Sequence, residues 1–166
     1  MKAHPFGPPR PPFAGWPVQV VDARIGYVWF VAPNVFVSQA HVRHASVECA
    51  HAIHDWIDRV HAARRAEIDD AGGLACLHDW SALEGYDAAA RRAYQERMRS
   101  RPRGYLKLAY TVVPASSPLL RMAVEAGNLA AQIGSGGRIM LATDAASALA
   151  KLRIHAPATS ERFPGT

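Results

Sequence analysis

The side chains best suited to chemistry in this sequence are histidines, which bind metal ions and exchange protons near neutral pH. Five of the eight histidines lie between residues 41 and 61. A helix over residues 46–65 would place four potential ligands along one side: His51, His54, Asp58 and His61. Neighbours in this row, such as His54 and Asp58, could reach one metal ion.

Two features argue against a metal site in this row. It extends over about 15 Å of helix at 1.5 Å per residue, so one ion could not bind all of it. The sequence also lacks the HExxH spacing of helical zinc sites. We therefore expect no metal, and instead a solvated row of histidines beside an apolar face. With a pKa of about 6.5, these histidines would make the row more positive below neutral pH.

A second candidate is the segment LHDWS, residues 77–81, where His78, Asp79 and Ser81 supply the residue types of a hydrolase triad. Adjacent residues of a strand point to opposite faces, so His78 and Asp79 are not expected to form a relay. Asp79 is expected to accept backbone N–H groups in the following turn. The segment GSGG, residues 134–137, follows a predicted helix and precedes a predicted strand, so we interpret it as a helix C-cap and turn. We predict a protein that is not an enzyme and needs no cofactor.

Much of the net charge of +5 comes from one segment. Residues 84–103 carry a group of arginines, which are Arg91, Arg92, Arg97, Arg99, Arg101 and Arg103. The end of this segment, RMRSRPR (97–103), could bind phosphates, but no aromatic residues are interleaved in that run as stacking platforms. Cations also complement the negative end of a helix dipole. We expect a solvated helix end, and nucleic acid is not an expected partner.

The two cysteines, Cys49 and Cys76, each lie in an apolar pattern and are not spaced as a metal-binding pair. We expect both to be buried free thiols, which favours a cytoplasmic location. No apolar run approaches the ~20 residues that cross a bilayer, so an integral membrane protein is not expected.

Hydrophobic spacing predicts the elements that must position these residues. β-branched and apolar runs indicate strands at 18–25, 27–33, 74–80, 105–114 and 138–143. Three- and four-residue spacing, with N-cap residues, indicates helices at about 46–65, 87–100, 117–133 and 144–152. The order ββαβαβαβα predicts an α/β fold with a mostly parallel sheet of four to five strands, an N-terminal antiparallel hairpin and helices packed on it. Residues 34–45 fit either a strand extension or a loop.

The expected domain organisation is simple. Half of the twelve prolines lie in residues 1–17, which predicts a flexible arm unless Phe6, Phe13 or Trp16 docks on the body. Residues 18–155 are expected to form one domain, and residues 156–166 a flexible tail. Helix 117–133 has two interpretations: it is an ordinary core helix, or it helps to enclose an apolar ligand. Its expected inward-facing residues are Leu119, Leu120, Met122, Ala123, Ala126, Ala130 and Ile133.

The element order resembles that of STAS domains, the anti-anti-sigma-factor-like family, and of their STAS/SEC14-like relatives. The resemblance covers about residues 18–153, and the local matches are HDW after a strand, YDAAARRAY opening a helix and SPLLRMAV after the fourth strand. In the regulatory family, an Asp-Ser-Ser-Gly type motif carries a serine whose phosphorylation releases a kinase partner. The matching residues here are Asp87, Ala88, Ala89 and Ala90, and Ala89 has no hydroxyl. The resemblance implies a protein-docking fold without the phosphoserine switch.

Two functions from different classes follow. The first is a non-catalytic regulatory or adaptor domain that docks a protein partner through the loop 79–87 and the following helix. Its expected contact residues are Asp79, Ser81, Tyr86, Asp87, Arg91 and Arg92. The alternative is a small-molecule or lipid-binding domain, in which helix 117–133 and the sheet enclose an apolar cavity, by analogy with the SEC14-like relatives.

Overall fold

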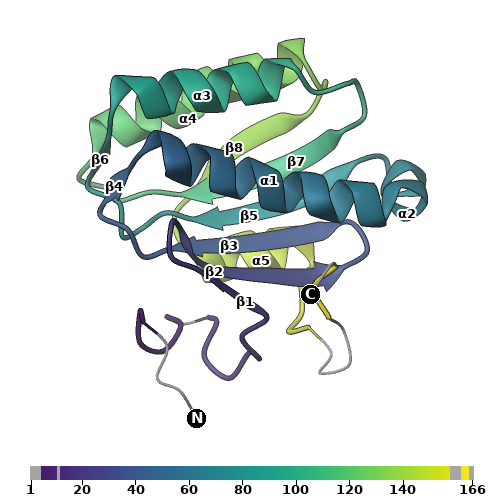
Figure 1. Cartoon of the computed structure of the whole chain (residues 1–166), viewed down its shortest axis with the longest axis horizontal. Helices are drawn as coiled ribbons and strands as arrows, with labels where there is room; N and C mark the ends of the chain where they lie inside the picture. Colours follow the sequence, from purple (N-terminus) through teal and green to yellow (C-terminus); the bar gives the residue numbers. More distant parts are fainter. Residues whose placement is uncertain (1–4, 11, 158–161, 165–166) are drawn as a thin grey trace.

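The structure is a computed structural model that describes residues 5–10, 12–157 and 162–164. A six-stranded sheet with the order β1-β2-β3-β5-β7-β8 forms its centre (Figure 1). The strands of this sheet are β1 (Val20–Asp22), β2 (Gly26–Ala32), β3 (Val35–Ala40), β5 (Leu74–Asp79), β7 (Leu106–Val112) and β8 (Arg138–Ala142). A second, two-stranded sheet pairs β4 (His44–Ala45) with β6 (Gly85–Tyr86).

The α/β fold expected from the sequence is confirmed, with one more strand in the central sheet than predicted and with the two-stranded sheet in addition. β1, β2 and β3 pair antiparallel, and β3, β5, β7 and β8 pair parallel. The extra strand, β3, comes from the segment that fitted either a strand or a loop. Gly26, at the start of β2, has a φ of +142°, and a Cβ there would lie 2.3 Å from the Gln39 carbonyl oxygen. Only glycine allows this close approach of β2 to β3.

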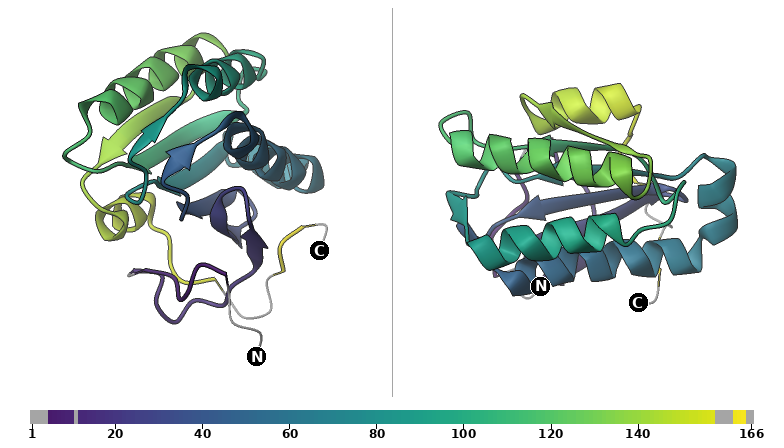
Figure 2. Two further views of the ribbon diagram at one scale, coloured as in Figure 1. Left: turned by 60° about the vertical axis from the view of Figure 1, so that its left-hand side comes forward. Right: turned by 90° about the horizontal axis from the view of Figure 1, so that it is seen from above.

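Five helices complete the chain as it is described: α1 (Val47–Ala63), α2 (Arg65–Asp70), α3 (Ala88–Arg99), α4 (Pro118–Ile133) and α5 (Ala145–Leu152). The N-caps expected for α3, α4 and α5 are confirmed, because Asp87, Ser117 and Asp144 each accept a backbone N–H of the first helical turn. GSGG ends α4 as expected, with Gly134 as the C-cap. Figure 2 shows α1, α3 and α4 together on one face of the sheet, and α5 on the opposite face.

Each strand divides its side chains between two apolar cores, one on each face of the sheet. In β5, Leu74 and Cys76 face the layer of α1, α3 and α4, whereas Ala75 and Leu77 face α5. His78 continues the first series. This two-residue alternation places the histidine of LHDW under the helical layer, although it is a polar residue at the end of an apolar run.

The expected inward face of α4 is partly wrong. Leu120 and Val124 are buried, but Leu119, Met122 and Ile133 are 69%, 62% and 65% exposed. α4 lies over the β8 edge of the sheet and beside α3, and none of the described elements covers its outer side. The apolar stripe of this helix is therefore wider than the surface available to bury it.

The proline-rich segment lies against the sheet in its described part. Phe13 is fully buried and stacks on Trp29 with ring centroids 4.8 Å apart, and Trp16 meets the same indole edge-on. The Trp29 indole N–H donates to the Pro17 carbonyl over 2.9 Å. Phe6 packs edge-on against Tyr27 with ring centroids 6.0 Å apart, so all three anchors named from the sequence contact the body. The predicted arm at 1–4 and 11, and the predicted tail at 158–161 and 165–166, lie outside the described residues, while Phe163 packs near Trp56.

Candidate functional site

A cavity of about 100 Å³ lies between the helical layer and the sheet. Its wall is formed by α1, α3 and α4 on one side and by β5 and β7 on the other. Most of the wall is apolar and includes Ile53, Ile57, Leu83, Leu106, Leu120 and Val124. Ala109 in the middle of β7 and Gly127 on α4 keep the space open, because larger side chains at these two positions would project toward it.

A row of four aromatic rings crosses this region. The ring centroids of His78 and Trp80 are 5.8 Å apart, those of Trp80 and Tyr94 are 5.3 Å apart, and those of Tyr94 and His54 are 5.8 Å apart. All four residues belong to the cavity wall. The row therefore combines flat apolar surfaces with polar atoms at its ring edges, a combination that suits specific binding of a small molecule.

His78 is a neutral member of this row. Its Nδ1 atom lies 2.8 Å from the Ser38 hydroxyl, which is its register neighbour on β3. Burial lowers the pKa of His78 to about 4, because the interior disfavours the charged imidazolium. At neutral pH the ring is uncharged and can share a hydrogen bond with a hydroxyl without bringing a charge into the core.

His54 is the second buried histidine, with 3% of its surface exposed. Its pKa is well below the usual value because of burial, with further contributions from the charges of Arg101 and Arg97. An Arg101 N–H donates to Nδ1 over 3.5 Å. A neutral ring that accepts at Nδ1 carries its proton on Nε2. This Nε2 atom has no hydrogen-bond partner among the residues that the structure describes.

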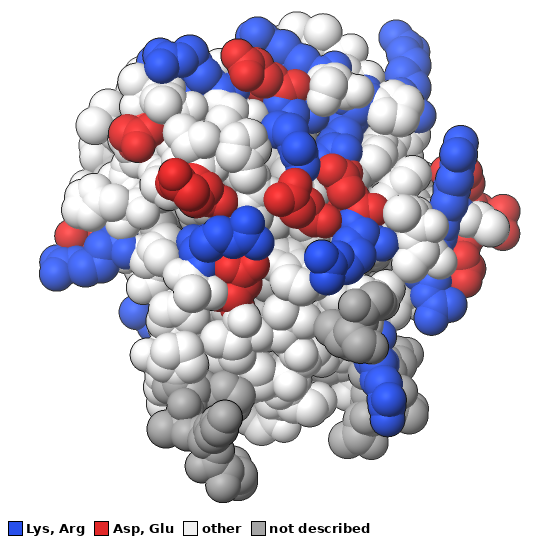
Figure 3. Space-filling model, viewed as in Figure 1, with Lys and Arg blue, Asp and Glu red and all other residues white. Residues whose placement is uncertain are grey.

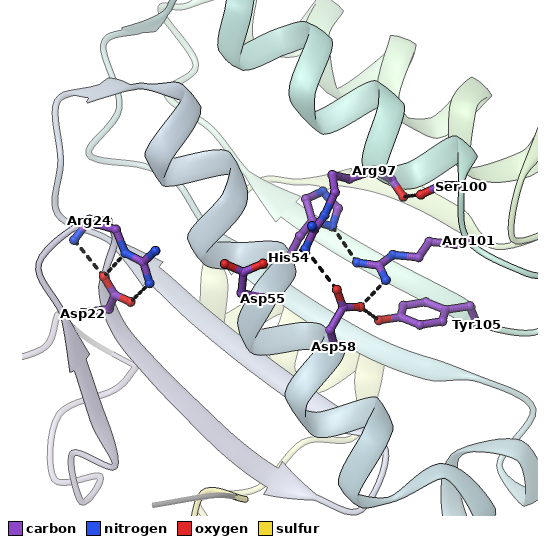
Figure 4. Close-up of polar contacts among 9 residues, drawn as sticks. All are labelled: Asp22, Arg24, His54, Asp55, Asp58, Arg97, Ser100, Arg101 and Tyr105. Carbon is purple, nitrogen blue, oxygen red and sulfur yellow. Dashed lines mark hydrogen bonds and ion pairs between the residues drawn. The ribbon is translucent and has the colours of Figure 1, made fainter.

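Charged residues hold Arg101 in place beside His54, as Figure 4 shows. The Asp58 carboxylate on α1 forms ion pairs with Arg101 and, over 3.0 Å, with Arg97. Arg97 also reaches Asp55 over 2.7 Å. The Tyr105 hydroxyl donates to Asp58, and burial together with this hydrogen bond raises the pKa of Tyr105. The network links α1 to α3 and the start of β7, and it fixes the Arg101 donor toward His54.

These contacts revise the expectation for the arginine-rich segment. Arg97 and Arg101 do not lie in a solvated helix end, because their guanidinium groups pair with the acidic residues of α1. Arg91 and Arg92 are exposed and form no salt bridge within the described part of the chain. On the face in Figure 3, Lys and Arg side chains gather at the top, where α3 lies.

The row of histidines predicted to be solvated is also different in the structure. His51 is exposed, but His54 is buried and His61 stacks on Tyr105 with centroids 4.2 Å apart. The pKa of His61 is lowered, mainly by burial, so the expected gain of positive charge below neutral pH does not apply to His54 and is weakened at His61. Over residues 5–10, 12–157 and 162–164, no cluster of three or more metal-ligating side chains is found.

The docking residues predicted from the sequence fall into two groups. Asp79 is buried and, as expected, accepts a backbone N–H in the turn, from Ser81 over 3.1 Å; it also accepts from the Gln39 amide over 3.2 Å. The Ser81 hydroxyl accepts a hydrogen bond from Arg10 of the proline-rich segment over 3.3 Å. Asp79 and Ser81 therefore face the proline-rich side of the sheet.

The remaining predicted residues lie toward the helical layer. Tyr86 and Arg91 contribute to the cavity wall, and the Tyr86 hydroxyl donates to the Leu119 carbonyl over 3.4 Å. Asp87 caps α3, and Arg92 points outward from the same helix. The six residues thus do not form one continuous surface, because the loop 79–87 passes from one face of the sheet to the other.

Among the residues that make the cavity polar, sequence reasoning named His54 and His78 for other chemistry and missed Trp80, Tyr94 and Thr111. One signal was available for His78, since it is in phase with Leu74 and Cys76 on a strand that should be buried on both faces. The other residues come from separate elements, and their convergence depends on how α1 and α3 cross the sheet.

Comparisons with protein-family models, curated proteins and solved structures found no match to this chain. The STAS-like resemblance therefore stays a prediction. Within the residues described, none of the helices has both the length and the apolar content needed to cross a bilayer.

Proposed function

We propose that this protein binds a small, largely apolar molecule in the cavity between its helical layer and its sheet. The observation that carries this proposal is the composition of the wall: an apolar surface on which buried, neutral polar groups converge from α1, α3 and β5. Such walls are typical of ligand sites, where apolar area provides affinity and a few polar groups fix the orientation.

The size of the cavity limits the ligand. An engineered apolar protein cavity of about 150 Å³ binds benzene. The cavity here measures about 100 Å³, so it suits a molecule with the bulk of a single ring after small side-chain movements. A long lipid chain would need displacement of whole helices from the sheet. We therefore favour a compact ligand over the lipid that the SEC14-like analogy implies.

Titration with methylenecyclohexane, an uncharged single-ring probe, tests this proposal. Binding should perturb the NMR signals of Ala109 and Val124 methyl groups and raise the melting temperature, since a ligand at 100 times its Kd stabilises a protein by about 2.7 kcal/mol. Ala109→Val, which fills the cavity from β7, should abolish both effects. Ala75→Val, on the opposite face of β5, is the control and should retain binding. Equal binding by the two variants would contradict the proposal.

A second candidate function, docking of a protein partner, is supported by the unpaired cations of α3. Arg91 and Arg92 are exposed, and Arg91 lies in the same cavity wall as Tyr86, so the contact surface of such a partner would be acidic. Affinity capture with wild type, compared with the double variant Arg91→Glu/Arg92→Glu, tests this candidate. Reversing Arg138 and Arg153 instead gives a control with the same change in net charge. A partner captured equally by all three proteins would exclude docking through α3.

The two cysteines support a cytoplasmic location as part of this proposal. Cys49 and Cys76 are both free and buried. Burial raises the pKa of Cys76 to about 12, so its thiol is protonated and unreactive at neutral pH. Such thiols suit a reducing compartment, and fractionation of the native host with a specific antibody would test the location.

A further inference from the structure

Two hydrogen-bond donors in the cavity wall have no acceptor within the described part of the chain. One is Nε2 of His54, and the other is the indole N–H of Trp80. Both residues line the cavity and flank the ring of Tyr94. Their donors are buried, so neither is satisfied by bulk solvent. Leaving a buried donor without an acceptor is costly, and native proteins do so rarely.

The state of His54 as a donor follows from its neighbours. Arg101 can only donate hydrogen bonds, so Nδ1 must accept, and a neutral imidazole then carries its proton on Nε2. Arg101 is itself held by its ion pair with Asp58. The network of α1 and Arg101 therefore leaves an N–H group rather than a lone pair at the unpartnered Nε2 of this cavity-wall residue.

The same network argues against a charged ligand. A cation would meet donors and no carboxylate, because Asp55 and Asp58 already pair with Arg97 and Arg101. An anion would have to lose its hydration inside an apolar wall, where only the exposed Arg91 at the margin carries a cation free of a salt bridge with a described residue. A neutral acceptor satisfies a donor without that cost.

We propose that the ligand is a neutral, ring-sized molecule with a carbonyl oxygen, and that this oxygen accepts a hydrogen bond from Nε2–H of His54. The inference rests on the proposed function and adds the chemical class of the ligand to it. Trp80 supplies a second donor at the same wall, which suits a second acceptor on the ligand. Tyr94, between the two donors, provides the surface on which the ring lies.

The test compares two probes that differ only in one group. Cyclohexanone and methylenecyclohexane have nearly the same shape, but the first carries C=O where the second carries C=CH₂. Their Kd values are measured by NMR titration with wild type and with His54→Phe, which keeps a ring against Tyr94 but removes the donor. We expect His54→Phe to lower the preference for cyclohexanone about tenfold, the value of one hydrogen bond in an apolar site. In wild type, cyclohexanone should move the His54 Nε2–H signal, and methylenecyclohexane should leave it in place.

The outcomes distinguish the hydrogen bond to His54 from the proposed function, which is binding of an apolar molecule in the cavity. If both probes bind and His54→Phe leaves their ratio unchanged, the hydrogen bond is wrong but the apolar site stands. If neither probe binds to wild type, the proposed function fails with it. Tighter binding of cyclohexanecarboxylate than of cyclohexanone would overturn the neutral ligand. If His54→Phe does not fold, the wild-type Nε2–H signal decides, and a signal that does not respond to cyclohexanone overturns the inference.

Discussion

The substitution Ala109→Val should stabilise this protein, whereas enlarging a residue in a packed core normally destabilises it. Ala109 is 2% exposed at the centre of β7 and lines the cavity. Valine adds two carbon atoms at a strand position, where its β-branched side chain suits the backbone. The cavity of about 100 Å³ can receive them without moving α1 or α4.

The magnitude follows from the apolar surface that the added carbon atoms bury. Each buried CH₂ contributes about 0.8 kcal/mol, so two contribute about 1.5 kcal/mol to the free energy of unfolding. For a chain of this size, that corresponds to a rise of about 3–6 °C in the melting temperature. In a core without a cavity, the same change would instead cost about 1–3 kcal/mol through forced rotamers and backbone shifts.

Urea and thermal unfolding of the wild type and the variant measure the sign directly. Ala75→Val is the matched control, because Ala75 is also a nearly buried strand alanine but faces the core under α5. We expect the control to be destabilised. If Ala109→Val is destabilised to the same extent as Ala75→Val, the space under the helical layer is closed in solution and our reasoning about the site is refuted.

Three further predictions concern the surroundings of the site. His78 alone should lower the stability by roughly 3 kcal/mol as the pH decreases from about 6.5 to about 4, because the unfolded chain takes up a proton there that the folded chain, with a pKa of about 4, does not. Urea titrations across this range should therefore show a flatter profile for His78→Gln, in which the fall that remains includes that of His54. Arg101→Met should lower the free energy of unfolding by about 2 kcal/mol, because it leaves the half-buried Asp58 carboxylate on α1 without its Arg101 partner. The midpoint of urea unfolding should hardly change for the control Arg43→Met, because the ion pair of Arg43 with Glu84 is exposed. Phe13→Ala should lower the free energy of unfolding by about 3 kcal/mol, because it removes the ring stacked on Trp29. It should also speed proteolytic cleavage within residues 5–17, and an unchanged cleavage rate would mean that this segment is not docked.

The sequence was most informative where local signals and burial agree. The N-caps Asp87, Ser117 and Asp144 mark helix starts because a side-chain acceptor at that point is a local requirement. The strand ending at Asp79 was recognised because an apolar run bounded by turn residues has few alternatives. These signals depend on neighbours in the chain, which a sequence displays directly.

The errors arose where contacts between distant segments decide. Leu119 and Met122 have the spacing of a core helix, but α4 lies at the sheet edge, so these side chains stay exposed in the described structure. From the sequence, His54 belongs to a solvated row, but in the structure it is buried and the segment after α3 places Arg101 beside it. The cavity is a property of several elements at once, and it depends on small residues such as Ala109 whose spacing alone does not indicate an opening.

The central claim is that an apolar guest can enter the space between the helical layer and the sheet. Crystals of the protein held under xenon pressure test it most directly, because xenon enters apolar cavities without needing a specific chemical group. Our account predicts a xenon atom among Ile53, Ala109 and Val124, and its loss in crystals of Ala109→Val. Continuous packing in this region, with no xenon at a pressure that fills known apolar cavities, would contradict the account.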